Sequence, residues 1–167
     1  MVAAPTAGLH FTKELITNIE RSGRDIRYVT LHVNLGTFAP LTEEHWRDKK
    51  LHEEWYEIDA ETAEFLNEAK KNHRPIIAVG TTTVRTLESA ATEGTLQCLS
   101  ETTDIFITEH DTLHFVDGLI TNFHVPKSSL LMLVSAFTGR ETLLELYQKA
   151  IEKEYRFFSF GDGMMII

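Results

Sequence analysis

Three consecutive threonines behind a glycine are the residues of this sequence best suited to binding a ligand. They form the run Gly80-Thr81-Thr82-Thr83-Val84-Arg85, which follows the apolar stretch 76–79 and opens a helical pattern. In α/β proteins, ligands bind beyond the carboxyl ends of strands, where a helix N-terminus offers free N–H groups. The hydroxyls and N–H groups could bind a carboxylate, a phosphate or a ribose, and Arg85 adds a charged fork. A structural alternative is equally consistent with the spacing: the threonines cap the helix and Arg85 pairs with Glu88.

A second polar group follows a later expected strand. Asn122 and His124 are two positions apart in a segment expected to be extended, so their side chains are expected on the same side. A histidine at such a junction is either a proton-transfer group or a hydrogen-bonded structural residue. Lys127, expected at the start of the next helix, opposes the helix dipole, which indicates an anionic ligand.

The N-terminal segment 4–12 is rich in small residues and places His10 at the entrance of a helix. Close approach of a ligand explains this composition, and so does the looseness common near chain ends. His110 and His114 are four positions apart but fall in an expected strand or turn, where that spacing does not converge on one ion. We therefore expect no metal site.

Hydrophobic periodicity places these residues in one α/β domain over residues 1–167. It predicts helices over 11–22, 60–69 (capped by Asp59), 81–91 and 126–137 and a further helix ending near 153; strands over 26–34, 76–79, 105–107, 114–116 and 157–160; and an extended stretch over 119–125. The polar stretch 41–54 reads as an exposed loop or a short helix. Strands that alternate with helices predict a largely parallel or mixed sheet flanked by helices.

Composition limits the classes of partner. The net charge of −9 argues against non-specific binding to a phosphate backbone, which depends on Lys and Arg. Two local basic clusters, 21–27 and 70–74, are more often solvated helix ends than binding patches. A single cysteine, Cys98, excludes an internal disulfide and fits a reducing cytoplasmic setting. The start of the sequence lacks the pattern of a signal peptide, and no apolar run approaches the roughly 20 residues of a membrane span, so we expect neither export nor a membrane partner.

Taken together, these segments resemble the S-adenosylmethionine:tRNA ribosyltransferase-isomerase family almost from end to end. The matching stretches are AAPTAGLHFT at 3–12, VTLHVNLGTF at 29–38, IAVGTTTVRTLESA at 77–90, LITNFHVPKSSLLMLVSAF at 119–137 and YRFFSFGDGMMI at 155–166. Five ordered motifs of this length are highly specific. The resemblance covers the C-terminal half of the family. It implies an incomplete, barrel-like α/β domain without the family's N-terminal half and β-barrel insert. Asn34 replaces a usual glycine, and Glu109-His110 replaces a usual Pro-Gly turn.

The resemblance also implies a reaction in queuosine biosynthesis. The family transfers and isomerises the ribosyl part of S-adenosylmethionine onto 7-aminomethyl-7-deazaguanine in the anticodon region of tRNA, and releases adenine and methionine. S-adenosylmethionine is therefore a substrate, and no metal is involved. Its sulfonium acidifies neighbouring C–H bonds, so the site must supply a base, a donor for adenine and anchors for the methionine carboxylate.

Under this resemblance each candidate residue has an expected role. His124 or His10 transfers protons, and Asn122 orients them. The substrate-binding residues are Thr81, Thr82, Thr83, Arg85, His32, Lys127 and Asp162. Two alternatives remain open: an inactive module that binds S-adenosylmethionine or tRNA or is structural, and an enzyme that acts on a free nucleoside. Because part of an α/β sheet exposes an edge and an apolar face, we also expect self-association.

Overall fold

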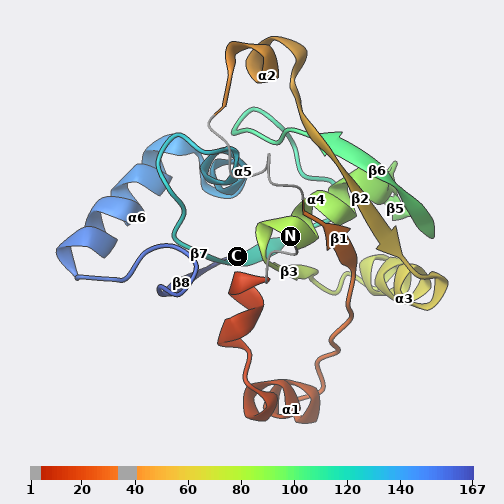
Figure 1. Ribbon diagram of the computed structural model, residues 1–167. Helices are drawn as coiled ribbons and strands as arrows, with labels where there is room; N and C mark the ends of the chain where they lie inside the picture. The colour runs from red at the N-terminus through yellow and green to blue at the C-terminus, as the bar shows by residue number, and fades with distance from the viewer. Residues whose placement is uncertain (1–4, 34–40) are drawn as a thin grey trace.

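Two small sheets share one central helix in this protein. The computed structural model describes residues 5–33 and 41–167 (Figure 1). In chain order the elements are η1 (Thr6–His10), α1 (Lys13–Arg21), β1 (Thr30–His32), α2 (Glu43–Asp48), β2 (Lys50–Ile58), α3 (Ala60–Lys71), β3 (Ile77–Val79), α4 (Thr81–Ala90), β4 (Ala91–Thr92), β5 (Thr95–Leu96), β6 (Leu99–Ile105), β7 (Gly118–Asn122), α5 (Ser129–Thr138), α6 (Arg140–Glu152) and β8 (Gly163–Ile166).

Strand pairing makes the fold a mixed α/β structure. The first sheet has the order β1-β2-β6 and is antiparallel throughout. The second has the order β3-β7-β8, in which β3 and β7 are parallel and β8 is antiparallel to β7. The predicted α/β class is confirmed in its mixed form, because β3–β7 is the one parallel pair among the described strands.

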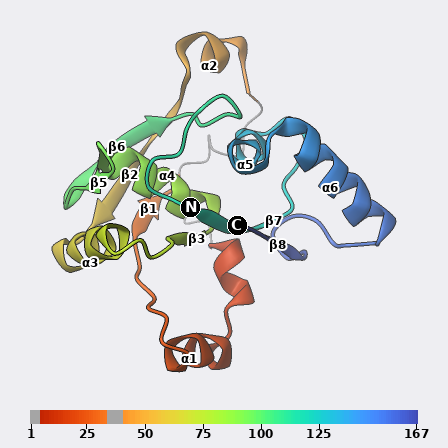
Figure 2. The same cartoon turned by 180° about the vertical axis from the view of Figure 1, so that it is seen from behind.

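Helix α4 lies between the two sheets and carries the centre of the core (Figure 2). It contacts β1 and β6 on one side and β3 and β7 on the other. Its residues Val84, Leu87 and Ala90 are buried, and they join a cluster that includes Phe115 and Val134. Helix α4 is therefore packed against both three-stranded sheets.

Local signals set several boundaries as expected. The Asp59 carboxylate accepts a hydrogen bond from the Thr62 N–H at 2.7 Å, which confirms it as the cap of α3. Gly139, at φ +75°, ends α5. The start of α5 was misplaced, however. Ser128 caps the helix through the Leu131 N–H, so α5 begins at Ser129, and Lys127 at φ +58° lies before the helix.

Other predicted elements are absent from the described residues or are shifted. No strand forms over 157–160, because this segment folds into a turn closed by the Asp162 N–H on the Arg156 carbonyl, and the final strand is β8. The N–H groups of 114–116 bond to the Glu88 carboxylate instead of to a strand. Strand β6 ends at Ile105, before the rest of predicted strand 105–107.

Strand β2 was not predicted, because the polar residues of 41–54 hid its alternation. Glu54, Tyr56 and Ile58 face the core, while Glu53 and Glu57 face solvent. The short helix expected in that stretch is α2. Of predicted strand 26–34 only β1 forms among the described residues, and Asn34 lies outside them.

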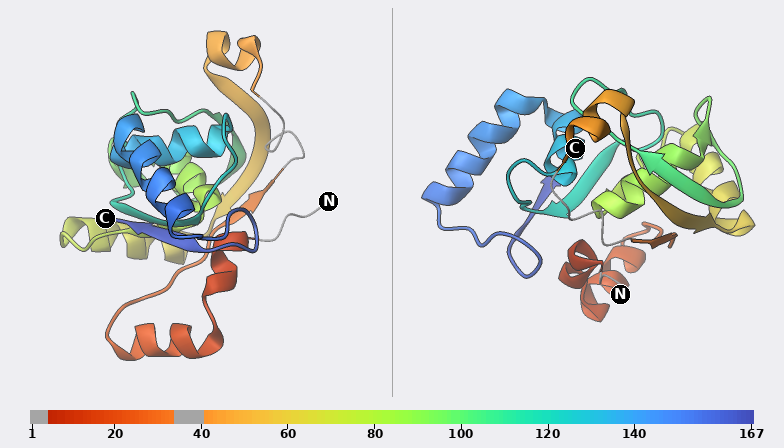
Figure 3. Two further views of the ribbon diagram at one scale, coloured as in Figure 1. Left: turned by 90° about the vertical axis from the view of Figure 1, so that its left-hand side faces the viewer. Right: turned by 45° about the horizontal axis from the view of Figure 1, so that its top comes forward.

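Helix α1 is confirmed, but its apolar stripe is not part of the core. None of its residues is buried, and Leu15 is 41% exposed. The helix stands away from both sheets (Figure 3). In α6, Leu143 and Tyr147 are buried, whereas Leu144 and Ile151 are exposed.

Candidate active site at the β3–β7 edge

The parallel pairing of β3 and β7 brings two of the predicted motifs to one edge of a sheet. Val79 and Ile120 are register partners, and the Gly80 N–H donates to the Ile120 carbonyl at 2.8 Å. The Gly80 turn and the end of β7 at Asn122 therefore lie side by side. The carboxyl ends of neighbouring parallel strands are where α/β proteins bind ligands.

A third motif reaches the same edge from the N-terminal segment. The Asn122 side-chain Nδ2 lies 3.2 Å from His10 Nε2 and donates to the Phe158 carbonyl at 3.1 Å. Because Nδ2 donates to both, His10 Nε2 is the acceptor and its Nδ1 carries the proton. Asn122 is buried, and its Oδ1 has no hydrogen-bond partner among residues 5–33 and 41–167. A buried acceptor without a partner costs about 1–3 kcal/mol, which points to a donor supplied by a ligand.

The turn before β8 completes this edge. Gly163 is the register partner of Asn122, and a Cβ on Gly163 would lie 3.2 Å from His10 Nε2. A larger residue at 163 would therefore displace the imidazole. The Asp162 carboxylate accepts hydrogen bonds from the Arg156 backbone N–H at 2.8 Å and from Arg156 Nη2 at 2.9 Å. These bonds hold the pKa of Asp162 below its usual value, and they give Asp162 a role in closing the turn.

The three threonines of α4 differ in what they bond. Thr83 Oγ1 donates to the Val79 carbonyl at 2.8 Å, so this hydroxyl serves the backbone. Among the described residues, the hydroxyls of Thr81 and Thr82 make no side-chain hydrogen bond, and Thr81 is buried. Gly80 offers no side-chain cap. Thr81 and Thr82 therefore fit the proposed anchoring role better than Thr83 does.

Arg85 forms a buried ion pair with Glu54 of β2. The structural alternative predicted an ion pair of Arg85 with Glu88. An ion pair is present, but its partner is Glu54. Glu88 instead accepts hydrogen bonds from three backbone N–H groups of 114–116. Arg85 is 2% exposed, and within the described part of the chain its Nε and Nη2 have no hydrogen-bond partner. The pair links α4 to the first sheet directly behind the threonine turn.

His124 does not share a side with Asn122, and this expectation was wrong. Strand β7 ends at Asn122, and the His124 Nε2 lies 2.9 Å from Thr121 Oγ1, on the face opposite to the Asn122 side chain. The His124 backbone N–H donates to the Tyr147 hydroxyl at 2.8 Å. Burial lowers the pKa of His124 to about 4. The ring is therefore neutral at physiological pH and is a weaker base than proton transfer near neutrality favours.

This lowered pKa gives a pH-dependent stability. In the unfolded chain the pKa of His124 returns to about 6.5, so the unfolded state takes up the proton first as the pH falls. The contribution is complete above pH 6.5 and is lost as the pH falls towards 4, by about 2–3 kcal/mol. Urea unfolding between pH 7 and pH 4 should show a smaller loss for His124→Gln than for the unchanged protein. The exposed-site variant His110→Gln should follow the unchanged protein, and equal losses in all three would contradict this assignment.

Two other predicted binding residues lie away from this cluster. His32 is exposed in the first sheet, and its ring packs edge-on against Trp55 with 4.6 Å between ring centres. Lys127 is exposed in the turn before α5. No contact among the described residues joins either side chain to His10 or Asn122.

The two basic clusters take part in structural contacts. The Arg27 guanidinium lies 4.0 Å and that of Arg74 5.8 Å from the centre of the Phe65 ring. Arg74 also pairs with Asp25 at 2.6 Å, and Lys70 pairs with Asp117 at 2.6 Å. These contacts agree with the interpretation of both clusters as solvated helix ends.

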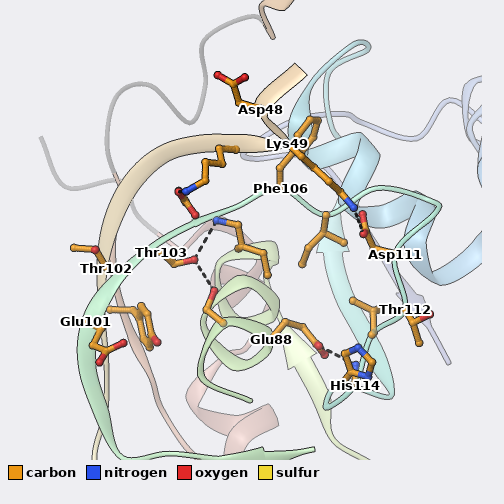
Figure 4. A pocket seen from close by; sticks show the side chains of 17 residues that line it. Asp48, Lys49, Glu88, Glu101, Thr102, Thr103, Phe106, Asp111, Thr112 and His114 are labelled. Carbon is orange, nitrogen blue, oxygen red and sulfur yellow. Dashed lines mark hydrogen bonds and ion pairs between the residues drawn. The ribbon is translucent and has the colours of Figure 1, made fainter. Parts of the chain in front are cut away.

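A cavity of about 530 Å³ lies elsewhere, between β6, the start of β2 and the loop 106–114. Figure 4 shows the ion pair of Lys49 with Asp111 at this cavity, and Glu88 below it. A second ion pair, between Lys50 and Asp104, also lines the cavity. None of the predicted site residues lines it. Among residues 5–33 and 41–167 there is no group of three metal-ligating side chains, and no helix is long and apolar enough to cross a membrane.

Comparison with known proteins assigns the family. The family model described as queuosine biosynthesis protein matches residues 1–166. The chain belongs to this family. A curated relative from Carboxydothermus hydrogenoformans, named S-adenosylmethionine:tRNA ribosyltransferase-isomerase, is 55% identical over 99% of this chain and 49% of its own length. A relative of the same name from Thermosynechococcus vestitus is 54% identical, over 99% of the chain and 47% of its own length.

A solved structure agrees with this assignment. The crystal structure of an S-adenosylmethionine tRNA ribosyltransferase from Thermotoga maritima matches with a TM-score of 0.81 and 43% identity, over 96% of this chain and 51% of its own. The resemblance found in the sequence is therefore confirmed, and the chain spans about half the length of the curated relatives it matches. In this member of the queuosine biosynthesis family, Glu109 Oε2 accepts a hydrogen bond from the Arg140 N–H, the first of α6, at 3.0 Å.

Proposed function

We propose that this chain carries the part of a ribosyltransferase-isomerase that binds S-adenosylmethionine. The reaction transfers and isomerises the ribosyl moiety onto 7-aminomethyl-7-deazaguanine in the anticodon region of tRNA. It yields epoxyqueuosine-tRNA in the cytoplasm, with release of adenine and methionine. The observation that carries the proposal is the convergence of His10, Asn122 and Gly163 at the edge where Gly80 opens α4. Motifs from four distant parts of the sequence meet there.

His10 acts on the departing adenine in this proposal. Its Nε2 accepts from Asn122, so Nδ1 carries the proton of the neutral ring. Nδ1 donates a hydrogen bond to adenine and stabilises the negative charge that develops there as adenine leaves. Asn122 thereby orients His10 and fixes which nitrogen donates. His124 stabilises the end of β7 through Thr121 and is not part of the proton transfer.

The remaining candidates hold the substrate. The hydroxyls of Thr81 and Thr82 and the free N–H groups at the start of α4 bind the methionine carboxylate or ribose hydroxyls. Arg85 supports them from behind through its pair with Glu54. The Asn122 Oδ1, which has no partner in the part of the chain that the structure describes, accepts a hydrogen bond from an N–H or O–H of the substrate. No step requires a metal.

The test has two stages. Thermal unfolding with S-adenosylmethionine at 100 times its dissociation constant should show about 2.7 kcal/mol of stabilisation. With a tRNA carrying the target base, chromatography should then detect adenine release. No stabilisation by S-adenosylmethionine at millimolar concentration would contradict the proposal.

The principal alternative is an inactive module that binds S-adenosylmethionine or tRNA. The observation that favours it is the net charge of −9, which disfavours contacts with the tRNA backbone. Stabilisation by S-adenosylmethionine without adenine release would select this alternative. Adenine release from S-adenosylmethionine in the absence of tRNA would instead indicate an enzyme of free nucleosides.

We also propose that the isolated chain self-associates. Both outer strands of the β3-β7-β8 sheet have an open edge, and on β8 Met165 is 60% exposed. Light scattering at increasing concentration should show a rising mean mass. A constant monomer mass would contradict this part of the proposal.

A further inference from the structure

The turn before β8, residues 156–162, displays two phenyl rings on the surface beside His10. We call it the aromatic turn. It is closed at its base by the Arg156–Asp162 pair and by the Asp162 N–H on the Arg156 carbonyl at 2.7 Å. Inside it, the Gly161 N–H donates to the Phe158 carbonyl at 3.1 Å. A Cβ at Gly161 would lie 2.3 Å from the Arg156 carbonyl oxygen, so only glycine allows this closure.

One ring of the turn fixes it to the core. Phe157 is half-buried, with its ring centre 4.9 Å from that of Phe123 and 5.7 Å from that of Tyr147. The Phe158 N–H donates to the Phe123 carbonyl, and the Phe158 carbonyl accepts from Asn122 Nδ2. The turn is therefore held in one conformation by the same asparagine that orients His10.

The other two rings face solvent. Phe160 is 85% exposed and Phe158 is 52% exposed. Phe158 also has φ +70°, a conformation that costs a bulky residue on the order of 1–3 kcal/mol. Rings this exposed add little burial energy to the fold. Hydrogen bonds and an ion pair fix the base of the turn, while the rings of Phe158 and Phe160 face solvent. This arrangement makes the two rings available for contact with a ligand.

The position of these rings indicates their ligand. The turn lies beside η1, which carries His10 (Figure 3), and Asp162 and Gly163 continue from it into the candidate site. Exposed aromatic rings bind unpaired nucleobases by stacking, irrespective of base identity. With a net charge of −9, the chain has little affinity for phosphates, so contacts to bases must supply the binding. The open surface suits a base carried on a macromolecule, since small ligands need concave sites.

We propose that the aromatic turn is a stacking platform for an unpaired base of the substrate tRNA, with Phe160 as the contacting ring and Phe158 as its support. This inference rests on the proposed function for the identity of the RNA. It adds a contact that holds the RNA beside His10 before any chemistry takes place.

The experiment measures RNA binding without S-adenosylmethionine, so it is independent of the transfer reaction. The probe is a fluorescent anticodon stem-loop that carries 7-aminomethyl-7-deazaguanine, titrated with the unchanged chain and with Phe160→Ala and Phe160→Trp. Phe160→Ala removes the ring on which one base stacks, so it should weaken RNA binding about 5- to 100-fold. Phe160→Trp keeps an aromatic ring at this position and should bind the RNA as tightly as the unchanged chain. The matched control is Leu144→Ala, which removes a side chain that is 50% exposed on α6 and should bind the RNA normally.

A double-mutant cycle identifies the stacked base. Stem-loops that lack single bases in the loop should bind the unchanged chain less tightly at one position, and Phe160→Ala should add no further loss at that position. Losses that add fully at every position would overturn the proposal, and so would normal RNA binding by Phe160→Ala or no RNA binding by the unchanged chain.

If Phe160→Ala instead weakened the binding of S-adenosylmethionine, the ring would stack on the adenine of that substrate. If Phe160→Ala dissociated a dimer of the chain, the aromatic turn would contact a second copy of the chain. Either result would also overturn the proposal. RNA binding can depend on Phe160 even if the chain releases no adenine. The experiment therefore tests the stacking proposal separately from the proposed function.

Discussion

Replacement of Arg85 by methionine should lower the free energy of unfolding by about 3–5 kcal/mol, because it removes the positive charge beside a carboxylate that is fully shielded from water. The side chains of Arg85 and Glu54 are 3% and 0% exposed. Urea unfolding at pH 7 measures the change, as a lower midpoint with an unchanged slope.

Two further variants distinguish a charge effect from a packing effect. In Arg85→Met/Glu54→Gln both charges are gone, so much of the lost stability should return. Arg140→Met replaces an exposed arginine that forms no ion pair among the described residues and should change stability by less than about 0.5 kcal/mol. A loss below about 1 kcal/mol for Arg85→Met would show that the pair is not a stabilising link between α4 and the first sheet.

His10→Ala should reduce adenine release about 10²- to 10³-fold, because it removes the hydrogen-bond donor that stabilises the charge developing on the departing base. The side chain of His10 is exposed, so stability should change little. Release is measured by chromatography in the assay that establishes activity for the unchanged protein. The control is His110→Ala, whose side chain is 85% exposed and which should retain full activity.

The role of Asn122 can be separated from that of His10 by spectroscopy. An aspartate at 122 accepts where the Nδ2 group donates, so Asn122→Asp should move the His10 proton from Nδ1 to Nε2. Nitrogen chemical shifts of the imidazole report which nitrogen is protonated. An unchanged pattern in Asn122→Asp, or near-normal adenine release by His10→Ala, would remove the pair from the mechanism.

Helix ends that are set by neighbouring residues could be predicted from the sequence. Asp59 before an apolar stripe and Gly139 after one mark helix ends because capping acts within a few residues. Strand β2 was missed because Glu54 faces inward, and its burial depends on Arg85, 31 positions away. The aromatic segment 157–160 has the composition of a strand, but bonds between Arg156 and Asp162 close it as a turn. Hydrogen bonds of this kind cannot be predicted from the hydrophobic periodicity of the sequence.

The candidate site was predicted in part for the same reason. Gly80 and Asn122 could be placed at a common edge because both follow strands. The separation of Asn122 from His124 could not, because it depends on the residue at which β7 ends and on Tyr147, which accepts the His124 N–H. The contact of His10 with Asn122 had no signal in spacing, and Gly163 was not recognised at all. A glycine directly after Asp162 in a segment that otherwise favours a strand was the available hint.

The hydrogen bond between His10 and Asn122 joins positions 112 residues apart. Contacts of such long range form late in folding, because the entropy of closing the intervening loop must be overcome before the contact contributes any stability. We therefore expect the edge that holds these two side chains to be assembled after more local contacts, such as those of α4 with β3. Because β8 supplies Gly163 opposite Asn122, we expect a folding intermediate without β8 to lack this edge.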